Sequence, residues 1–351
     1  MSGVIGHSLY AVLALKASEA RGNPIAAILR RNHASYLAGA YLGCDIQTLP
    51  AAIGLRSGTE SGYAKLPAGV IEINGEPVRQ WRLESGGKAF TPGEIHALFY
   101  GRAHLILGWP ASQRDRSVPS DHLPDYFAAT VDDAVELFEP GERKLAYLFG
   151  WICHTVGDAM IKSVIPGADL KLLNGTYTPE NRPIQDLVSF HEIGRKELGL
   201  DWRALLSDAC ETPVEDIQPH YMRCAPRRGR LGELFPDAWE PGREALLRQV
   251  MAKNREHLKV WLQRALRDLE LKRSGDEWEC RPELSRQAGG LDYREMVETA
   301  EKAGFRKALW RIAERIAGTF DETVERAETL RGARGARTAD WAEITKRWMK
   351  K

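Results

Sequence analysis

A histidine and an aspartate lie four residues apart in an apolar stretch of this chain. His154 and Asp158 belong to a run that we expect to form a helix over about residues 144 to 165. A spacing of i and i+4 places both side chains on one helical face. Burying an imidazole and a carboxylate there costs several kcal/mol unless a partner satisfies them, and a divalent metal ion is a partner that uses both groups. The pattern therefore predicts a metal site, whose other ligands come from elsewhere in the chain.

The elements that would position such a site are mostly helical by sequence pattern. Apolar residues recur at helical spacing in most of the chain, and Asn74-Gly75 between two alternating runs predicts a β-hairpin over about residues 70 to 83. We therefore predict an all-α fold with a small β-hairpin insertion. The expected helices cover residues 7–21, 24–42, 92–108, 122–138, 144–165, 184–198, 202–210, 244–272, 293–302 and 305–329.

The last third of the chain differs in character from the rest. After a basic, turn-rich stretch near residues 223–230, the expected helix over 244–272 is strongly charged and amphipathic. Its positive and negative side chains alternate, which favours packing with a partner or self-association over DNA binding. We predict a helical domain over residues 1–215 and a charged α-helical C-terminal region over 216–351.

Bulk composition narrows the possible functions and the compartment. The 351 residues carry a formal net charge of +1, so no whole-molecule field attracts nucleic acid, and stable DNA binding is not expected. No stretch of about 18 apolar residues predicts a transmembrane segment. Five cysteines without a CxxC pair indicate reduced thiols, and the apolar start at 3–15 lacks the basic residues of a signal peptide. A cytoplasmic protein is the expectation.

Several runs in the first part of the chain, taken in order, resemble the zinc-dependent phospholipase C and P1-type nuclease superfamily. The resemblance covers roughly residues 3 to 200. It implies a multi-helix phospholipase C-like domain for residues 1–215 that hydrolyses phosphoesters. The runs that carry the resemblance are Gly6-His7-Ser8-Leu9-Tyr10-Ala11, Gly39-Ala40-Tyr41-Leu42-Gly43-Cys44-Asp45, Phe99-Tyr100 with His104, Gly150-Trp151-Ile152-Cys153-His154-Thr155-Val156-Gly157-Asp158, and Phe190-His191-Glu192.

The resemblance implies a set of metal ligands and their roles. Asp45 matches an aspartate that binds zinc and orients or deprotonates the attacking water, and Asp158 matches one that bridges two metals. His96 and His122 lie close enough in sequence to compete with the histidine at position 104. The implied ligands are His7, Asp45, His104, His154, Asp158 and His191.

Two positions depart from the family pattern. The family places a histidine six residues after Asp158 and an acid four residues after His191, where this chain has Val164 and Arg195. We therefore expect one or two zinc ions and no full trinuclear centre. Lys162 and Arg195 could supply positive charge to the phosphate in place of the missing zinc.

These observations predict a zinc-dependent phosphoester hydrolase in which Asp45, Lys162 and Arg195 carry catalysis with the metal. The expected substrate is a phospholipid head group or a phosphoester small molecule, with nuclease-like phosphodiesterase activity as a second possibility. An alternative is a non-catalytic member of the fold that serves as a helical scaffold. The C-terminal helices could mediate homo-oligomer formation or bind a membrane surface.

Overall fold

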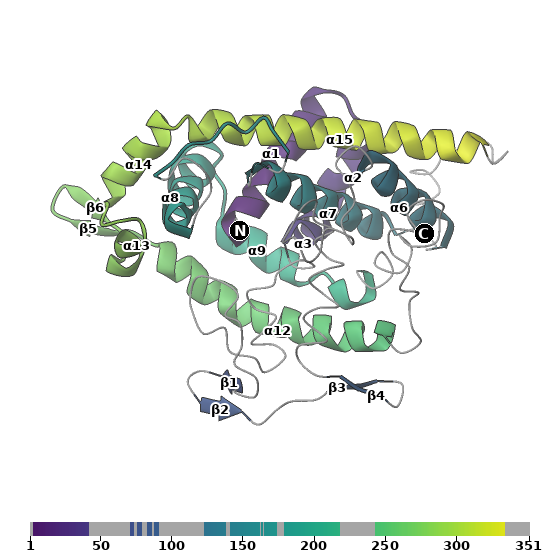
Figure 1. The fold of residues 1–351 in the computed structure, drawn as a ribbon, viewed down its shortest axis with the longest axis horizontal. Coiled ribbons are helices and arrows are strands. Elements are labelled where there is room, and N and C mark those ends of the chain that lie inside the picture. Colours follow the sequence, from purple (N-terminus) through teal and green to yellow (C-terminus); the bar gives the residue numbers. More distant parts are fainter. Residues whose placement is uncertain are drawn as a thin grey trace.

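The computed structural model describes residues 3–41, 71–73, 76–78, 83–85, 88–90, 123–137, 141–161, 163, 165–173, 179–217 and 243–333. The described chain is mostly helical, as the sequence pattern predicts (Figure 1). Its helices are α1 (Val4–Ala20), α2 (Ile25–Arg31), α3 (His33–Tyr41), α6 (Leu123–Leu137), α7 (Glu142–Ile161), η3 (Pro179–Asn181), α8 (Arg182–Leu187), η4 (Val188–Glu197), α9 (Trp202–Cys210), α12 (Arg243–Leu269), α13 (Pro282–Gln287), α14 (Tyr293–Lys302) and α15 (Phe305–Ala333).

Three two-stranded antiparallel ribbons accompany these helices among the described residues. The predicted hairpin at Asn74-Gly75 is confirmed, because Ile73 pairs with Glu76 across it. The other two ribbons were not predicted from the sequence pattern. The strands are β1 (Ile71–Ile73), β2 (Glu76–Val78), β3 (Leu83–Ser85), β4 (Lys88–Phe90), β5 (Lys272–Ser274) and β6 (Glu277–Glu279).

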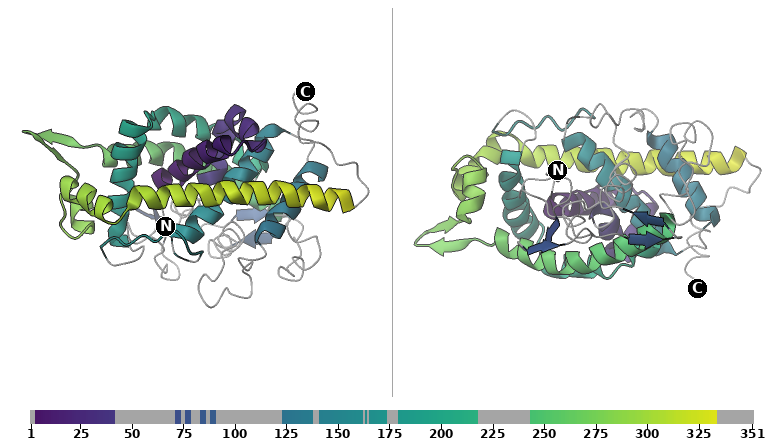
Figure 2. Two further views of the ribbon diagram at one scale, coloured as in Figure 1. Left: turned by 90° about the horizontal axis from the view of Figure 1, so that it is seen from above. Right: turned by 60° about the horizontal axis from the view of Figure 1, so that its bottom comes forward.

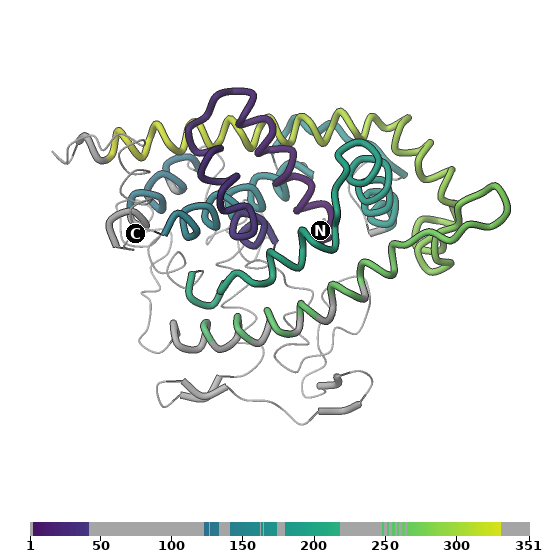
Figure 3. The backbone as a smooth tube through the Cα atoms, turned by 180° about the vertical axis from the view of Figure 1, so that it is seen from behind, coloured from purple at the N-terminus to yellow at the C-terminus, as the bar shows by residue number. Residues whose placement is uncertain are grey.

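Helix α7 lies at the centre of the helical assembly, where it packs against the N-terminal helices and α15. It packs most extensively against α3 and also contacts α1, α15 and α6. Figure 1 shows α15 along one side of the molecule and α12 along the opposite side, with α1, α3 and α7 between them. Figure 3 shows α9 between α3 and α12, and α9 contacts both of them. The residues of α7 from 145 to 161 are all buried.

The C-terminal helix α15 contributes to the same hydrophobic core as the N-terminal helices. Phe320 contacts Tyr36 of α3 and Phe149 of α7 edge to face, with ring centroids 6.4 Å and 5.0 Å away. Figure 2 shows α15 crossing the N-terminal helices along its length. One cluster of buried side chains thus joins residues from both predicted regions. The predicted boundary at residues 215 and 216 stays a prediction, because residues 218–242 lie outside the described part.

One predicted helix is two helices in the structure. The expected helix over residues 24–42 is divided into α2 and α3 at Asn32, whose φ of −116° and ψ of 39° are not helical. Its side-chain amide donates to the carbonyl of Ile28 at 3.1 Å and to Glu142 at 3.0 Å. Asparagine side chains compete with the helical hydrogen-bond ladder in this way. The prediction of one continuous helix was therefore wrong at this residue.

A second departure lies in the segment predicted as one α-helix over residues 184–198. It begins as α8 and continues as the π-helix η4 over Val188–Glu197. Within η4 the carbonyl of Phe190 accepts from the indole Nε1–H of Trp202 at 3.0 Å. A Cβ on Gly194 would lie 2.4 Å from Trp202 Cζ2, so glycine is what lets the indole pack there. This contact comes from α9, and local periodicity does not reveal it.

Two helix ends also differ from expectation. The long helix predicted to reach residue 165 ends at Ile161, because Ser163 takes a positive φ of 58°. The helix predicted to reach residue 272 ends at Leu269, and the exposed β5–β6 ribbon begins at Lys272. Among the described helices, none has the combination of length and apolarity needed to cross a membrane.

Candidate metal centre

His154 and Asp158 lie on one face of α7, as their spacing predicts. Each is only 3% exposed. The Nδ1–H of His154 donates to the carbonyl of Ala40, 2.8 Å away. Because a carbonyl only accepts, this bond places the proton on Nδ1, so Nε2 is the ring nitrogen whose lone pair can bind a metal ion. Such a hydrogen bond is typical of a metal-binding histidine.

The contact between His154 and Ala40 depends on two glycines that bring α3 and α7 together. A Cβ on Gly150 would lie 1.9 Å from the carbonyl oxygen of Tyr36, and one on Gly39 would lie 1.9 Å from that of Tyr147. No side chain fits in either place. The backbones of α3 and α7 therefore touch directly.

The third member of the site comes from the first helix. His7 is 2% exposed, and its Nε2 lies 3.4 Å from Asp158 Oδ1. Its ring stacks on that of His154, with centroids 4.0 Å apart and planes 17° apart. One ligand atom from each of His7, His154 and Asp158 lies within 4.8 Å of the others.

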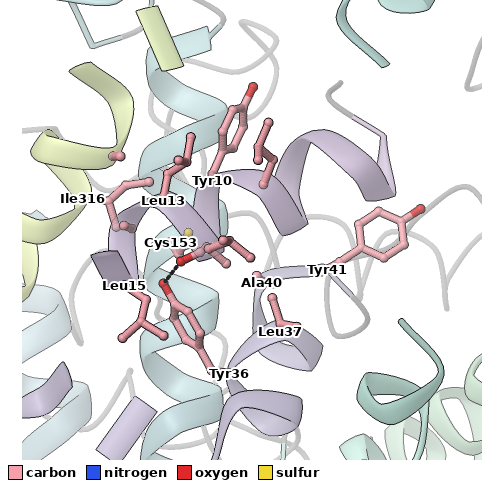
Figure 4. Close-up of a cluster of buried hydrophobic side chains, with 14 of the residues drawn as sticks. Tyr10, Leu13, Leu15, Tyr36, Leu37, Ala40, Tyr41, Cys153 and Ile316 are labelled. Carbon is pink, nitrogen blue, oxygen red and sulfur yellow. Dashed lines mark hydrogen bonds between the residues drawn. The ribbon is translucent and has the colours of Figure 1, made fainter. Parts of the chain in front are cut away.

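Aromatic side chains of α1 and α3 border this group. The rings of Tyr10 and Tyr41 lie 5.7 Å and 6.3 Å from that of His7, measured between centroids. A Cβ on Gly157 would lie 2.7 Å from Tyr10, so α7 again needs a glycine here. Figure 4 shows Tyr10, Tyr41 and Ala40 together with other side chains of this buried region.

A buried tyrosine stabilises the α1–α3–α7 junction one turn away from the site. The hydroxyl of Tyr36 donates to the carbonyl of Ala11 at 3.0 Å, the bond drawn in Figure 4. Burial raises the pKa of the Cys153 thiol, and the neighbouring Tyr36 hydroxyl opposes this only in part. The thiol of Cys153 therefore stays protonated, and it is a core group here.

Two imidazoles and one carboxylate form a donor set that suits a divalent metal ion. Zinc is bound by such nitrogen and oxygen ligands in three-ligand catalytic sites, and ferrous iron is held by two histidines and one carboxylate in other proteins. The chemistry of the donors therefore fits one metal ion.

The other residues predicted for this site fall into two groups. Asp45, His104 and Lys162, together with the competing His96 and His122, lie outside the described residues. His191 and Arg195 are described, and both lie in η4.

Among the described residues, the structure does not bring His191 to His7, His154 and Asp158. Its Nε2–H donates to the carbonyl of Leu269 at 2.8 Å, and its ring meets Tyr293 edge to face at 5.8 Å. Burial lowers the pKa of His191, although the bond to Leu269 opposes the shift. This histidine joins η4 to the C-terminal end of α12.

Arg195 also has a different setting from the one expected. Its guanidinium forms two hydrogen bonds with Glu270, at 2.9 Å and 2.6 Å, and lies 4.3 Å from the centroid of the Phe190 ring. These contacts link η4 to the residue that follows α12. The structure gives Arg195 an ion-pair role in the fold.

A charged pair that the sequence pattern did not predict lies close to His7. Arg182 and Asp186 lie one turn apart on α8, with Arg182 Nε 3.4 Å from Asp186 Oδ2. Both side chains lie close to Gly3, the residue before α1. A Cβ on Gly3 would lie 3.1 Å from each of them. The i,i+4 spacing of an arginine and an aspartate was visible in the sequence. It did not reveal that α8 packs against α1.

Comparisons of this chain with protein families, with curated proteins and with solved structures found no match. The case for a function therefore rests on the site itself and on the resemblance of the sequence motifs.

Proposed function

We propose that this protein is a metal-dependent phosphoester hydrolase whose divalent metal ion is held by His7, His154 and Asp158. The observation that carries this proposal is the buried convergence of two imidazoles and a carboxylate within 4.8 Å. When bound, the metal supplies a water molecule activated for attack near neutral pH and stabilises charge on the phosphate. Three protein ligands leave a coordination position for that chemistry.

The chain's own residues would divide the work as follows. His154 is held by the Ala40 carbonyl, so its Nε2 is oriented before a metal arrives. Asp158 lies on the same face of α7 and faces His7 across the site. By resemblance, Asp45 and His104 bind a second zinc ion where two are present, and Asp45 orients or deprotonates the attacking water.

The source of positive charge for the substrate differs from the first expectation. Arg195 is bonded to Glu270, so we no longer assign it to the substrate. Lys162 stays the proposed cation, one turn beyond Asp158 in sequence. Zinc, as one or two ions, is the metal proposed from the resemblance.

The substrate proposed first is a phospholipid head group or another small phosphoester, and a nucleotide or short single strand comes second. We also propose a cytoplasmic location, since the described thiols Cys153, Cys210 and Cys280 are free. We further propose that the protein self-associates through its C-terminal helices. The exposed β5–β6 ribbon and the charged helix α12 are the surfaces available for such a contact.

The deciding experiment measures metal and turnover on the same preparations. We expect the purified protein to contain zinc by mass spectrometry and to cleave a chromogenic phosphodiester or a short-chain phosphatidylcholine. His154→Ala and Asp158→Asn should lose both properties. The control His33→Ala should keep both, because the ring of His33 contacts Tyr36 outside the metal group.

The scaffold alternative predicts a different result from the same experiment. The chain has Val164 and Arg195 where the family has two further metal ligands, which favours a member of the fold without activity. Bound metal with no turnover of any phosphoester would support the scaffold and overturn the hydrolase. Absence of a bound divalent ion after reconstitution would overturn the metal centre as well.

A further inference from the structure

The two ring nitrogens of His7 differ in their surroundings. Nε2 faces Asp158 at 3.4 Å, whereas Nδ1 is buried and has no hydrogen-bond partner among the described residues. A metal-binding histidine almost always donates its second ring N–H to a carboxylate, a carbonyl or a water molecule. His154 has this partner in Ala40. His7 lacks one in the part of the chain that is described.

The carboxylate of Asp186 lies beside the first turn of α1, toward which the side chain of His7 points. Asp186 Oδ2 and Oδ1 would lie 3.1 Å and 3.3 Å from a Cβ on Gly3, and the carbonyl of Gly3 accepts from the His7 amide at 3.2 Å. Side chains of an α-helix point back toward its N-terminus. The imidazole of His7 therefore leans toward Gly3, on the side where Asp186 lies.

The electrostatics of Asp186 link it to His7 as well. Burial raises the pKa of the Asp186 carboxyl, and Arg182 and then His7 are among the groups that oppose this increase. Arg182 also holds the carboxylate from the same helix. The carboxylate lies at the N-terminus of α1, where the helix dipole stabilises a negative charge. Asp186 is thus placed and oriented as an acceptor near His7.

We propose that Asp186 is a positioning residue for the metal centre: its carboxylate accepts the Nδ1–H of His7 when Nε2 binds the metal ion. Arg182 fixes the carboxylate in place, and the bond forms together with metal binding. The two histidines are then oriented alike, His154 by a backbone carbonyl and His7 by a carboxylate. This inference rests on the proposed metal centre and adds to it a residue that the sequence pattern did not reveal.

The test measures metal affinity and coordination, with no need for a substrate. Zinc affinity is obtained by competition with a chromophoric chelator, and cobalt(II) provides a visible spectrum that reports ligand geometry. Asp186→Asn should weaken zinc binding about 10- to 100-fold and alter the cobalt spectrum. Asp186→Glu should restore most of the affinity, which a purely structural role would not require.

Two further variants keep the test decisive. Asp169→Asn makes the same chemical change at an exposed carboxylate that pairs with Arg311, and it should leave both readouts unchanged. Gly3→Ala places a Cβ 3.1 Å from Asp186 and Arg182 and removes no polar group. It should displace the carboxylate and weaken zinc binding in the same direction, even if Asp186→Asn fails to fold.

The outcomes separate this inference from the metal centre itself. If Asp186→Asn binds zinc within about twofold of the parent with the same cobalt spectrum, while His154→Ala loses binding, the positioning role is overturned and the metal centre stands. If the parent protein binds neither ion, or His154→Ala binds like the parent, the metal centre fails and this inference fails with it.

Discussion

The rings of His7 and His154 stack 4.0 Å apart although one comes from α1 and the other from α7. Asp158 lies one turn beyond His154 on α7 and completes a buried group with both imidazoles. Burial of three such polar side chains is unfavourable without compensation. A bound cation would offset this cost, so the folded state should gain stability when a metal ion is present.

Metal binding should therefore raise the thermal stability of the protein. At a free zinc concentration about 100 times the dissociation constant, the expected gain is about 2.7 kcal/mol, or an increase in Tm of about 4 °C. His154→Ala should abolish the increase, since it removes one of three ligands. Differential scanning fluorimetry with zinc and with chelator measures it, and equal increases in parent and variant would contradict the assignment.

His191 serves as a comparison for His154, because it is a buried histidine that the structure places outside the group of His7, His154 and Asp158. Its Nε2–H donates to Leu269, so His191→Gln should leave zinc affinity within about twofold of the parent. The loss of this buried hydrogen bond should lower the unfolding free energy by about 1 to 2 kcal/mol. Metal titration and urea unfolding in chelator measure the two effects separately. A large loss of affinity with unchanged apo stability would return His191 to the ligand set.

Local sequence signals predicted several elements closely. The predicted bounds of α9 and α14 match the structure, and both helices begin at a capping aspartate. Asp201 accepts from the amide of Ala204, and Asp292 forms a capping box with Glu295. Such signals lie within a few residues of each other, so the sequence alone reveals them.

The parts that sequence could not predict depend on contacts between distant segments. Asn32, which ends α2, donates a hydrogen bond to Glu142 of α7, and Trp202 of α9 packs against η4 at Gly194. The same holds for the candidate site. The i,i+4 pair on α7 was visible directly, and His7 was identified through the resemblance, but Asp186 comes near His7 only because α8 packs against α1.

Protonation of His191 should make the protein less stable in acid. Burial lowers the pKa of His191 in the folded state, whereas the unfolded chain takes up the proton near pH 6.5. Below that pH the unfolded state binds more protons, so stability falls as the pH falls. Above about pH 7 this contribution is constant.

The difference in unfolding free energy between the parent and His191→Gln isolates this effect. We expect the difference to be constant from pH 7 to 8 and to shrink as the pH is lowered toward 5. Urea unfolding in the presence of chelator keeps metal binding out of the comparison. A difference that does not change with pH would show that His191 keeps its ordinary affinity for protons in the fold.

Replacing glycine by alanine should have opposite effects at Gly150, where α3 and α7 touch, and at Gly318, which lies in α15. Gly150→Ala would place a methyl group 1.9 Å from the Tyr36 carbonyl, and backbone cannot move aside as a side chain can. The substitution should destabilise the fold by about 3 kcal/mol and disturb the His154–Ala40 bond, which lowers zinc affinity.

Gly318 lies inside α15 with no atom within 4 Å of an added Cβ. Gly318→Ala should therefore stabilise the protein by about 0.5 to 1 kcal/mol through helix propensity, with zinc affinity unchanged. Urea unfolding and chelator competition on the two variants test both signs, and a neutral Gly150→Ala would mean that the helices are farther apart than the structure has them.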